Sequence, residues 1–163
     1  MSLSAPILHM MCGKIAAGKS TLAARLAQAD GTVLLAEDAW LNALYPDLIR
    51  SGADYLRYAS QLRSAMAPHI VSLLNKGVSV VLDFPANTVA QRAWMRGLIA
   101  ASGADHRLHL LQVSDETCLA RLHERNRRAD HPFKVTDAQF REFTRHFAAP
   151  MPDEGFTIVT CCA

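Results

Sequence analysis

The stretch from Met10 to Ala27 reads MMCGKIAAGKSTLAARLA. It places Gly13 and Gly18 between an apolar run and a run with the spacing of an amphipathic helix. The apolar run, Ile7–Cys12, predicts a strand, and residues 19–28 predict a helix. The two glycines therefore fall in the turn between the predicted strand and helix. Residues without a Cβ atom at these positions indicate that the turn does more than join the two elements.

Residues 13–20 (GKIAAGKS) match G-x-x-x-x-G-K-[ST], the pattern of a phosphate-binding loop. Glycines let the backbone curve around a polyphosphate, and successive N–H groups then point inward toward the anion. The following helix adds the donors of its N-terminus. In this pattern Lys19 contacts the β- and γ-phosphates, and the hydroxyl oxygen of Ser20 binds Mg²⁺. The predicted nucleotide-binding residues of the loop are Gly13, Lys14, Ala16, Ala17, Gly18, Lys19, Ser20 and Thr21.

The pattern alone does not separate ATPases, GTPases and kinases. Guanine-binding proteins of this class usually carry N-K-x-D after a later strand, whereas Asn75-Lys76 is followed here by Gly77-Val78. This difference favours ATP as the nucleotide. An ordinary strand–turn–helix connection is the structural alternative, and the strand and helix predicted on either side favour the phosphate loop.

Composition narrows the classes of function. The chain has 163 residues, which suits one domain over residues 1–163, and 50% of them are hydrophobic. A formal net charge of +2 gives no overall attraction to nucleic acid or membranes, so we expect neither as a partner. The four cysteines lack metal-binding spacing, and no secretory leader or membrane-length apolar run is visible. We therefore expect reduced thiols and a cytoplasmic protein.

Apolar runs alternate with helix-like runs along the rest of the chain. Val78–Asp83 (VSVVLD) is almost continuously aliphatic, which is typical of a strand buried on both faces of a parallel sheet. The alternation predicts an α/β fold with a mainly parallel sheet and right-handed crossovers. The expected strands are 7–12, 32–36, 78–83, 106–113 and 156–160; the expected helices are 19–28, 55–75 (whole or broken near Pro68), 88–101, 115–125 and 136–147.

Acidic residues fall where two expected strands end, the edge at which open α/β sheets bind ligands. Asp83 fits an acid that holds Mg²⁺ through water, as a Walker B acid does. Asp38 is the expected general base for an attacking hydroxyl, with the adjacent Glu37 as the alternative. The structural alternative is that Asp38 and Asp83 cap the helices that follow them. Trp40 and Tyr45 either line an acceptor pocket or pack elsewhere.

Arginines gather in the segment RLHERNRR. Arg121, Arg125 and Arg128 recur at helical spacing, which predicts that they share one face of a helix. Arginines stabilise the charge of a transferring phosphoryl group, and a mobile segment carrying them would exclude water from the nucleotide. We therefore expect a lid over about residues 125–136. The alternative is a solvated helix face on which Glu124 pairs with its neighbours.

Several segments, taken in order, resemble those of the zeta-toxin-like, chloramphenicol-phosphotransferase-like and polynucleotide-kinase-like P-loop kinases. They are GKIAAGKST, EDAWLNALYPD, VVLDF with Arg92 and Arg96 behind it, CLARLHERNRR and FTRHFAAPMPDEGF. The resemblance covers nearly the whole chain and looks closest to the small stand-alone ATP-binding proteins of this group. It implies a three-layer P-loop fold with a helical lid and a five-stranded parallel sheet in the order 2-3-1-4-5.

The resemblance also implies roles for individual residues. Asp38 would be the general base, Arg125 and Arg128 the lid residues, and Arg121 and the loop Pro150–Glu154 would flank adenine. The aromatic stretch that often follows LDF in the family is replaced here by Pro-Ala-Asn, so the family's acceptors do not transfer to this chain.

The sequence therefore predicts an ATP-dependent, Mg²⁺-requiring kinase that phosphorylates a hydroxyl of a small-molecule acceptor. A P-loop ATPase or a nucleotide-responsive binding protein without such an acceptor is the main alternative. A polynucleotide 5′-kinase is a further alternative, which the near-neutral charge disfavours.

Overall fold

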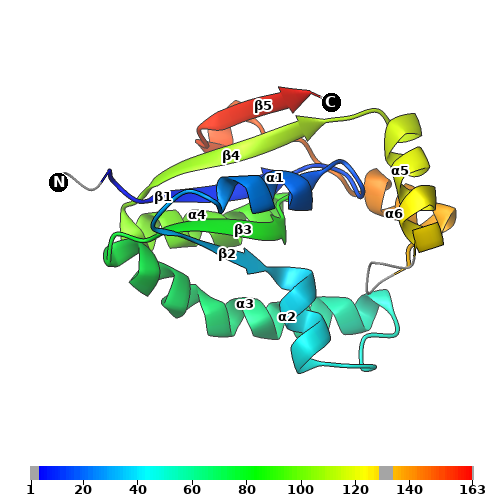
Figure 1. The fold of residues 1–163 in the computed structure, drawn as a ribbon, viewed down its shortest axis with the longest axis horizontal. Coiled ribbons are helices and arrows are strands. Elements are labelled where there is room, and N and C mark those ends of the chain that lie inside the picture. The colour runs from blue at the N-terminus through cyan, green and yellow to red at the C-terminus, as the bar shows by residue number, and fades with distance from the viewer. Residues whose placement is uncertain (1–3, 129–133, 163) are drawn as a thin grey trace.

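A parallel sheet of five strands runs through the computed structural model, which describes residues 4–128 and 134–162. Each described strand pair is parallel, and the order is β2-β3-β1-β4-β5. This confirms the predicted α/β class and strand order. The strands point the same way, so their carboxyl ends share one edge (Figure 1). Their bounds are β1 Ile7–Cys12, β2 Thr32–Ala36, β3 Ser79–Pro85, β4 Asp105–Gln112 and β5 Ile158–Cys162.

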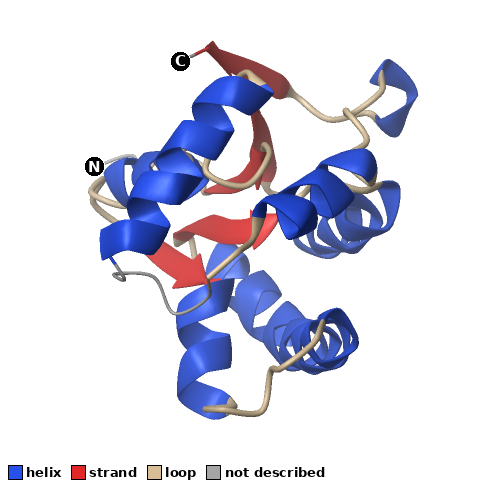
Figure 2. Cartoon of the chain, turned by 90° about the vertical axis from the view of Figure 1, so that its right-hand side faces the viewer, coloured by secondary structure: helices blue, strands red, loops and turns tan. Residues whose placement is uncertain are grey.

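Helices cover both faces of the sheet and make the fold three-layered (Figure 2). One core joins the sheet to α2, α3 and α4 through residues such as Leu41, Ile70 and Met95. The other joins it to α1, α5 and α6 through residues such as Leu122 and Phe140. The helices are α1 Lys19–Leu26, α2 Glu37–Leu44, α3 Gly52–Asn75, α4 Val89–Ser102, α5 Asp115–Arg128 and α6 Asp137–Arg145, and a 3₁₀ turn, η1, spans Pro152–Glu154. Within the described part of the chain, no helix is long and apolar enough to cross a membrane.

The long helix α3 is continuous through Pro68, so of the two predicted alternatives the whole helix is confirmed and the break is wrong. A buried stripe that includes Leu62, Met66 and Ile70 spans the proline and packs against the sheet, and this burial outweighs the local cost of proline. The helix ends at Asn75, as predicted, and Gly77 directly after its C-cap Lys76 has a φ of +83°, which suits glycine.

Most other boundaries differ from the predicted ones by one to three residues. β5 begins at Ile158, two residues later than expected, because Phe156 packs against the ring of His106 instead of entering the strand. α5 continues past Arg125 to Arg128, so the predicted lid begins inside a regular helix. Residues 129–133 of that predicted lid lie outside the described residues.

Candidate active site

The two glycines of the loop between β1 and α1 meet two different needs. Gly18 has φ +104°, a left-handed angle that glycine adopts readily. A Cβ at Gly13 would lie only 3.2 Å from the Cβ of Leu111 and 3.3 Å from the Cβ of Ala17, so Gly13 is needed for space. Between them Ala16 also takes a left-handed φ of +62°, which costs a non-glycine residue about 1 kcal/mol. The loop keeps the curved shape that turns N–H groups toward an anion despite this strain.

The ammonium of Lys19 lies inside the curve of the loop. Its Nζ donates to the carbonyl oxygens of Gly13 at 2.6 Å and Lys14 at 2.7 Å. Burial lowers the pKa of Lys19 to about 8, while the nearby carboxylates of Asp83 and Asp38 oppose this shift. The positive charge expected at the β- and γ-phosphates is therefore already placed in the free protein.

The first turn of α1 keeps its amide donors available for a ligand. Its N-cap is Gly18, which makes no side-chain capping hydrogen bond. Ser20 and Thr21 follow in the first turn and are exposed. A helix N-terminus that lacks a side-chain cap and has an exposed first turn is suited to bind phosphate. The Ser20 hydroxyl is likewise accessible to a cation.

Asp83 and Asp38 come together from neighbouring strands. Asp83 pairs in register with Ala36, the last residue of β2, and Asp38 follows two residues later. Both carboxylates act electrostatically on Lys19. The predicted helix-capping alternatives are wrong, because Ala36 is the N-cap of α2 and Thr88 is the N-cap of α4. Asp83 also lies within β3, two residues before its end.

The oxygen donors near Lys19 fit Mg²⁺ as a nucleotide-bound ion. The Ser20 hydroxyl and the Asp83 carboxylate are ligands of the kind that Mg²⁺ prefers, and this ion usually keeps water and phosphate oxygens as its other ligands. No cluster of three or more His, Cys, Asp or Glu side chains that could hold a metal occurs within residues 4–128 and 134–162.

The adjacent acids Glu37 and Asp38 have different surroundings. Glu37 is 1% exposed and accepts hydrogen bonds from the Tyr55 hydroxyl and from Nη2 of Arg63, the latter at 3.3 Å. Burial raises the pKa of the Glu37 carboxyl, which these two donors oppose. Asp38 is only half-buried. Of the two, Asp38 is thus the more exposed carboxylate, while Glu37 connects α2 to α3.

The arginines of α5 differ in burial and contacts: Arg125 is half-buried, whereas Arg121, Arg127 and Arg128 are exposed. Arg121 Nη1 donates to the carbonyl oxygen of Ala17 at 3.2 Å. Arg128, 66% exposed, donates from Nε to Glu124 at 2.9 Å. Glu124 also pairs with Arg127, so the predicted local pairing is present. The predicted shared face is confirmed by a hollow of about 550 Å³, lined by Ala120, Arg121, Glu124, Arg125 and Arg128.

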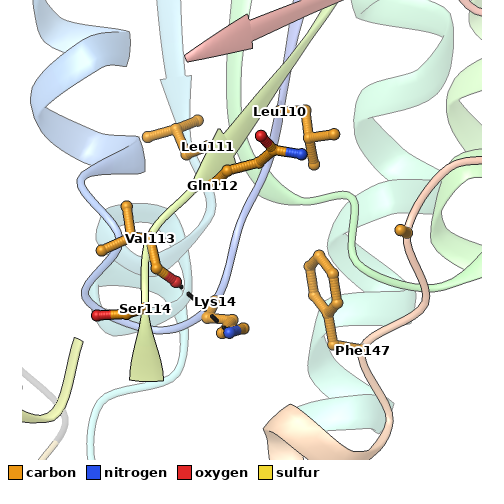
Figure 3. A pocket seen from close by; sticks show the side chains of 8 residues that line it. Lys14, Leu110, Leu111, Gln112, Val113, Ser114 and Phe147 are labelled. Atoms are coloured by element: carbon orange, nitrogen blue, oxygen red, sulfur yellow. Dashed lines mark hydrogen bonds between the residues drawn. The ribbon is translucent and has the colours of Figure 1, made fainter. Parts of the chain in front are cut away.

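A second hollow, of about 420 Å³, opens beside the phosphate loop at the carboxyl end of β4. Figure 3 shows Lys14 on one side of it and Phe147 on the other. The Nζ of Lys14 lies 3.5 Å from the carbonyl oxygen of Val113 and pairs with Asp115. The lining is mostly apolar and includes a few polar side chains, among them the ion-paired Lys14, which suits a flat ring carrying polar groups.

Three predicted site elements lie apart from the loop contacts above. Trp40 is 42% exposed, and Tyr45 packs against Tyr58 with the rings tilted and their centroids 4.3 Å apart. The segment Pro150–Glu154, expected beside Arg121, is held by α4 through an ion pair between Glu154 and Arg92. Whether these elements take part in binding stays a prediction.

Solved structures with the same fold include several kinases. A protein from Chloroflexus aurantiacus, whose own assignment as a kinase is provisional, is 20% identical with a TM-score of 0.75 over 97% of this chain and 85% of that chain. A sugar kinase from a Janibacter species is 17% identical with a TM-score of 0.66, over 96% and 84% of the two chains. The APS kinase of Mycobacterium tuberculosis, solved with AMPPNP and APS, is 22% identical with a TM-score of 0.61, over 95% and 88%.

These likenesses establish the fold as that of P-loop kinases. No curated protein sequence matches the chain. A family model described as an AAA domain matches residues 8–150, which include the phosphate loop, the acidic strand ends and the arginine-bearing helix. The chain therefore belongs to the AAA-domain family.

Proposed function

We propose that the chain is an ATP-dependent kinase that transfers the γ-phosphoryl group of Mg-ATP to a hydroxyl of a small-molecule acceptor. The observation that carries this proposal is the convergence of Asp38 and Asp83 on the loop-bound ammonium of Lys19. A phosphate loop alone would serve any nucleotide-binding protein. A half-buried carboxylate beside the expected γ-phosphate position adds the base that a hydroxyl acceptor needs.

In this proposal the loop binds and orients the nucleotide. The backbone N–H groups around Gly18 and the first turn of α1 donate to the phosphates, and Lys19 moves from the loop carbonyls to the β- and γ-phosphate oxygens. Ser20 and Asp83 would hold Mg²⁺, which neutralises charge on the β- and γ-oxygens when it is bound.

Asp38 accepts the proton of the acceptor hydroxyl as its oxygen bonds to the γ-phosphorus. The bond from that phosphorus to the β,γ-bridging oxygen breaks, and ADP leaves with the electron pair. Arg125 and Arg128 would stabilise charge on the transferring group after moving over the nucleotide, while Arg121 stays beside the loop.

The test is ADP release from Mg-ATP with and without pools of hydroxyl compounds: aminoglycosides, chloramphenicol, sugars, nucleosides and short oligonucleotides. We expect release to rise at least tenfold with one small-molecule pool, because positioning an acceptor and its base accelerates transfer over adventitious hydrolysis by about that factor or more. Equal release with and without every pool would instead favour the ATPase alternative.

The two adjacent acids offer a matched pair of variants for the same assay. We expect Asp38→Asn to lower acceptor-dependent turnover by about 100- to 1,000-fold at unchanged ATP affinity, because the base is lost. Glu37→Gln keeps the shape of the buried contact with Tyr55 and Arg63, so we expect a smaller loss, about tenfold or less. Full acceptor-dependent turnover in Asp38→Asn would contradict its assignment as the base.

A further inference from the structure

We propose that Asn87 is a positioning residue that holds the phosphate loop and couples it to the segment following α6. The Pro-Ala-Asn stretch, residues 85–87, consists of the last residue of β3 and the two residues that follow it. It lies between two parts of the site that are far apart in the chain. The inference rests on the proposed function only in requiring that the loop bind a nucleotide.

On one side, this stretch binds the start of the phosphate loop. The N–H of Gly13 donates to Oδ1 of Asn87 at 2.9 Å. The N–H of Ala86 donates to the carbonyl oxygen of Met11 at 3.1 Å, beside a register shift between Met10 and Met11. Gly13 is buried, so loss of the Asn87 oxygen would leave its N–H without a partner in a place that water does not readily reach.

On the other side, the same stretch binds the chain that leaves α6. The N–H of Ala148 donates to the carbonyl oxygen of Asn87 at 2.8 Å. The guanidinium of Arg92, which is 0% exposed, donates from Nη1 to the carbonyl oxygens of Ala86 at 3.0 Å and Ala148 at 2.7 Å. A change in the position of Ala148 therefore acts directly on the residue that holds Gly13.

Two further contacts fix this arrangement. Arg92 binds Glu154 through both carboxylate oxygens, at 2.7 Å and 3.2 Å, and this hydrogen bonding lowers the pKa of the Glu154 carboxyl. The N–H of Asn87 donates to the side-chain oxygen of Gln91 at 2.9 Å, within the capping box of α4. The backbone N–H of Asn87 is thus anchored by α4, while its side chain binds the phosphate loop and its carbonyl binds the segment after α6.

The consequence is reciprocal coupling between nucleotide binding and the segment after the predicted lid. A nucleotide that settles the loop around Gly13 favours the present position of Ala148. A displacement of the chain between α6 and Glu154 in turn weakens the hold on Gly13, because the linkage works equally in both directions.

The test is titration of the protein with a fluorescent ATP analogue and Mg²⁺, without any acceptor, beside the thermal unfolding midpoint of each variant. We expect Asn87→Ala to weaken binding about five- to tenfold, the effect of leaving one buried N–H unsatisfied. Asn87→Ser, too short to reach Gly13 but suited to a turn, should behave alike if the alanine variant folds poorly. The matched control is Asn75→Ala, at the exposed end of α3, which should bind within twofold of the unchanged protein.

Coupling is tested with Glu154→Gln, which weakens the ion pair with Arg92 and thereby acts on Ala148 and Asn87. We expect this variant to weaken binding about two- to threefold alone and to have no further effect in the Asn87→Ala background. Wild-type affinity in a folded Asn87→Ala or Asn87→Ser variant would overturn the proposal, and additive effects would overturn the coupling. If the unchanged protein binds the analogue but never shows acceptor-dependent turnover, the kinase proposal fails while this inference stands; if it binds no analogue, both are overturned.

Discussion

The phosphate loop and the arginine-bearing end of α5 are both expected to contact ATP, yet they differ in how far they are prepared for it. In the loop, Lys19 is held by two carbonyl oxygens and Gly13 by Asn87. At the end of α5, Arg128 is 66% exposed and binds Glu124 from its own helix. The difference teaches that the phosphate site exists before the nucleotide arrives, whereas Arg128 must exchange a local partner for the ligand.

Their positions in the fold explain this difference. The loop follows β1, the central strand, and is packed against the ends of the strands on both sides of it. The last turn of α5 leaves the sheet and has solvent on the face that carries Arg128. A central position supplies fixed partners, and a surface position allows a side chain to change partners at little cost.

The largest effect on activity should come from a change in the phosphate loop, where the binding groups are already in place. We expect Lys19→Ala to lower kcat/KM for Mg-ATP by about 1,000-fold or more, because it removes the charge at the β- and γ-phosphates. The folded fraction should fall little, because burial of the ammonium disfavours its charged form, as the lowered pKa of Lys19 reflects, and this offsets the loss of its two hydrogen bonds.

The measurement is steady-state ADP release together with a thermal unfolding curve. Lys76→Ala, at the exposed end of α3, is the matched control for loss of a lysine and should leave kcat/KM unchanged. Activity retained in Lys19→Ala would remove the loop from the mechanism altogether and with it the contrast between the two regions.

A smaller effect on activity is expected from changes to the arginines at the end of α5. We expect Arg125→Ala and Arg128→Ala each to lower kcat about 10- to 100-fold with little change in ATP affinity, because their contacts form only when phosphoryl transfer takes place. Single-turnover and binding measurements separate the two quantities. Arg127→Ala is the control, since Arg127 is 73% exposed and pairs with the same Glu124. Equal, small effects of Arg127→Ala and Arg128→Ala would show instead a solvated helix face.

Much of the fold and the phosphate loop could be predicted from sequence because the determinants are local. β1 and β2 begin and end at the predicted residues, and residues 13–20 carry their own pattern. The strand order came from a family resemblance, since periodicity alone does not say which strands are neighbours. The capping roles considered for Asp38 and Asp83 were wrong because strand pairing and the neighbouring residues Ala36 and Thr88 decide where the helices begin.

The contacts that hold the site could not be predicted, because they join residues distant in the chain. Asn87 binds Gly13 across 74 positions, and Arg92 binds Glu154 across 62. A buried arginine in α4 has no local signature that separates it from an exposed one. Tyr55 and Arg63 were missed as the partners of Glu37 for the same reason, although both lie in a helix that was predicted.

The smallest effect is a pH dependence of nucleotide affinity, which arises from Lys19 in the phosphate loop and not from the arginines of α5. Lys19 in the free protein has a pKa of about 8, lowered by burial, and bound phosphates would raise it. Below pH 8 the ammonium is already charged, so affinity for Mg-ADP is highest there; above it the nucleotide must bind together with a proton, and affinity falls. From pH 7 to pH 9 we expect about a tenfold rise in Kd.

The titration uses Mg-ADP, whose phosphates are already ionised over most of this range. Burial raises the pKa of the neighbouring Cys12 thiol to about 11 and also raises that of Cys118, so neither group accounts for a change below pH 9. In Lys19→Ala the weak residual binding should be independent of pH. A flat profile in the unchanged protein would mean that Lys19 is not confined among the loop carbonyls before ligand binds, and the contrast with the arginines of α5 would then disappear.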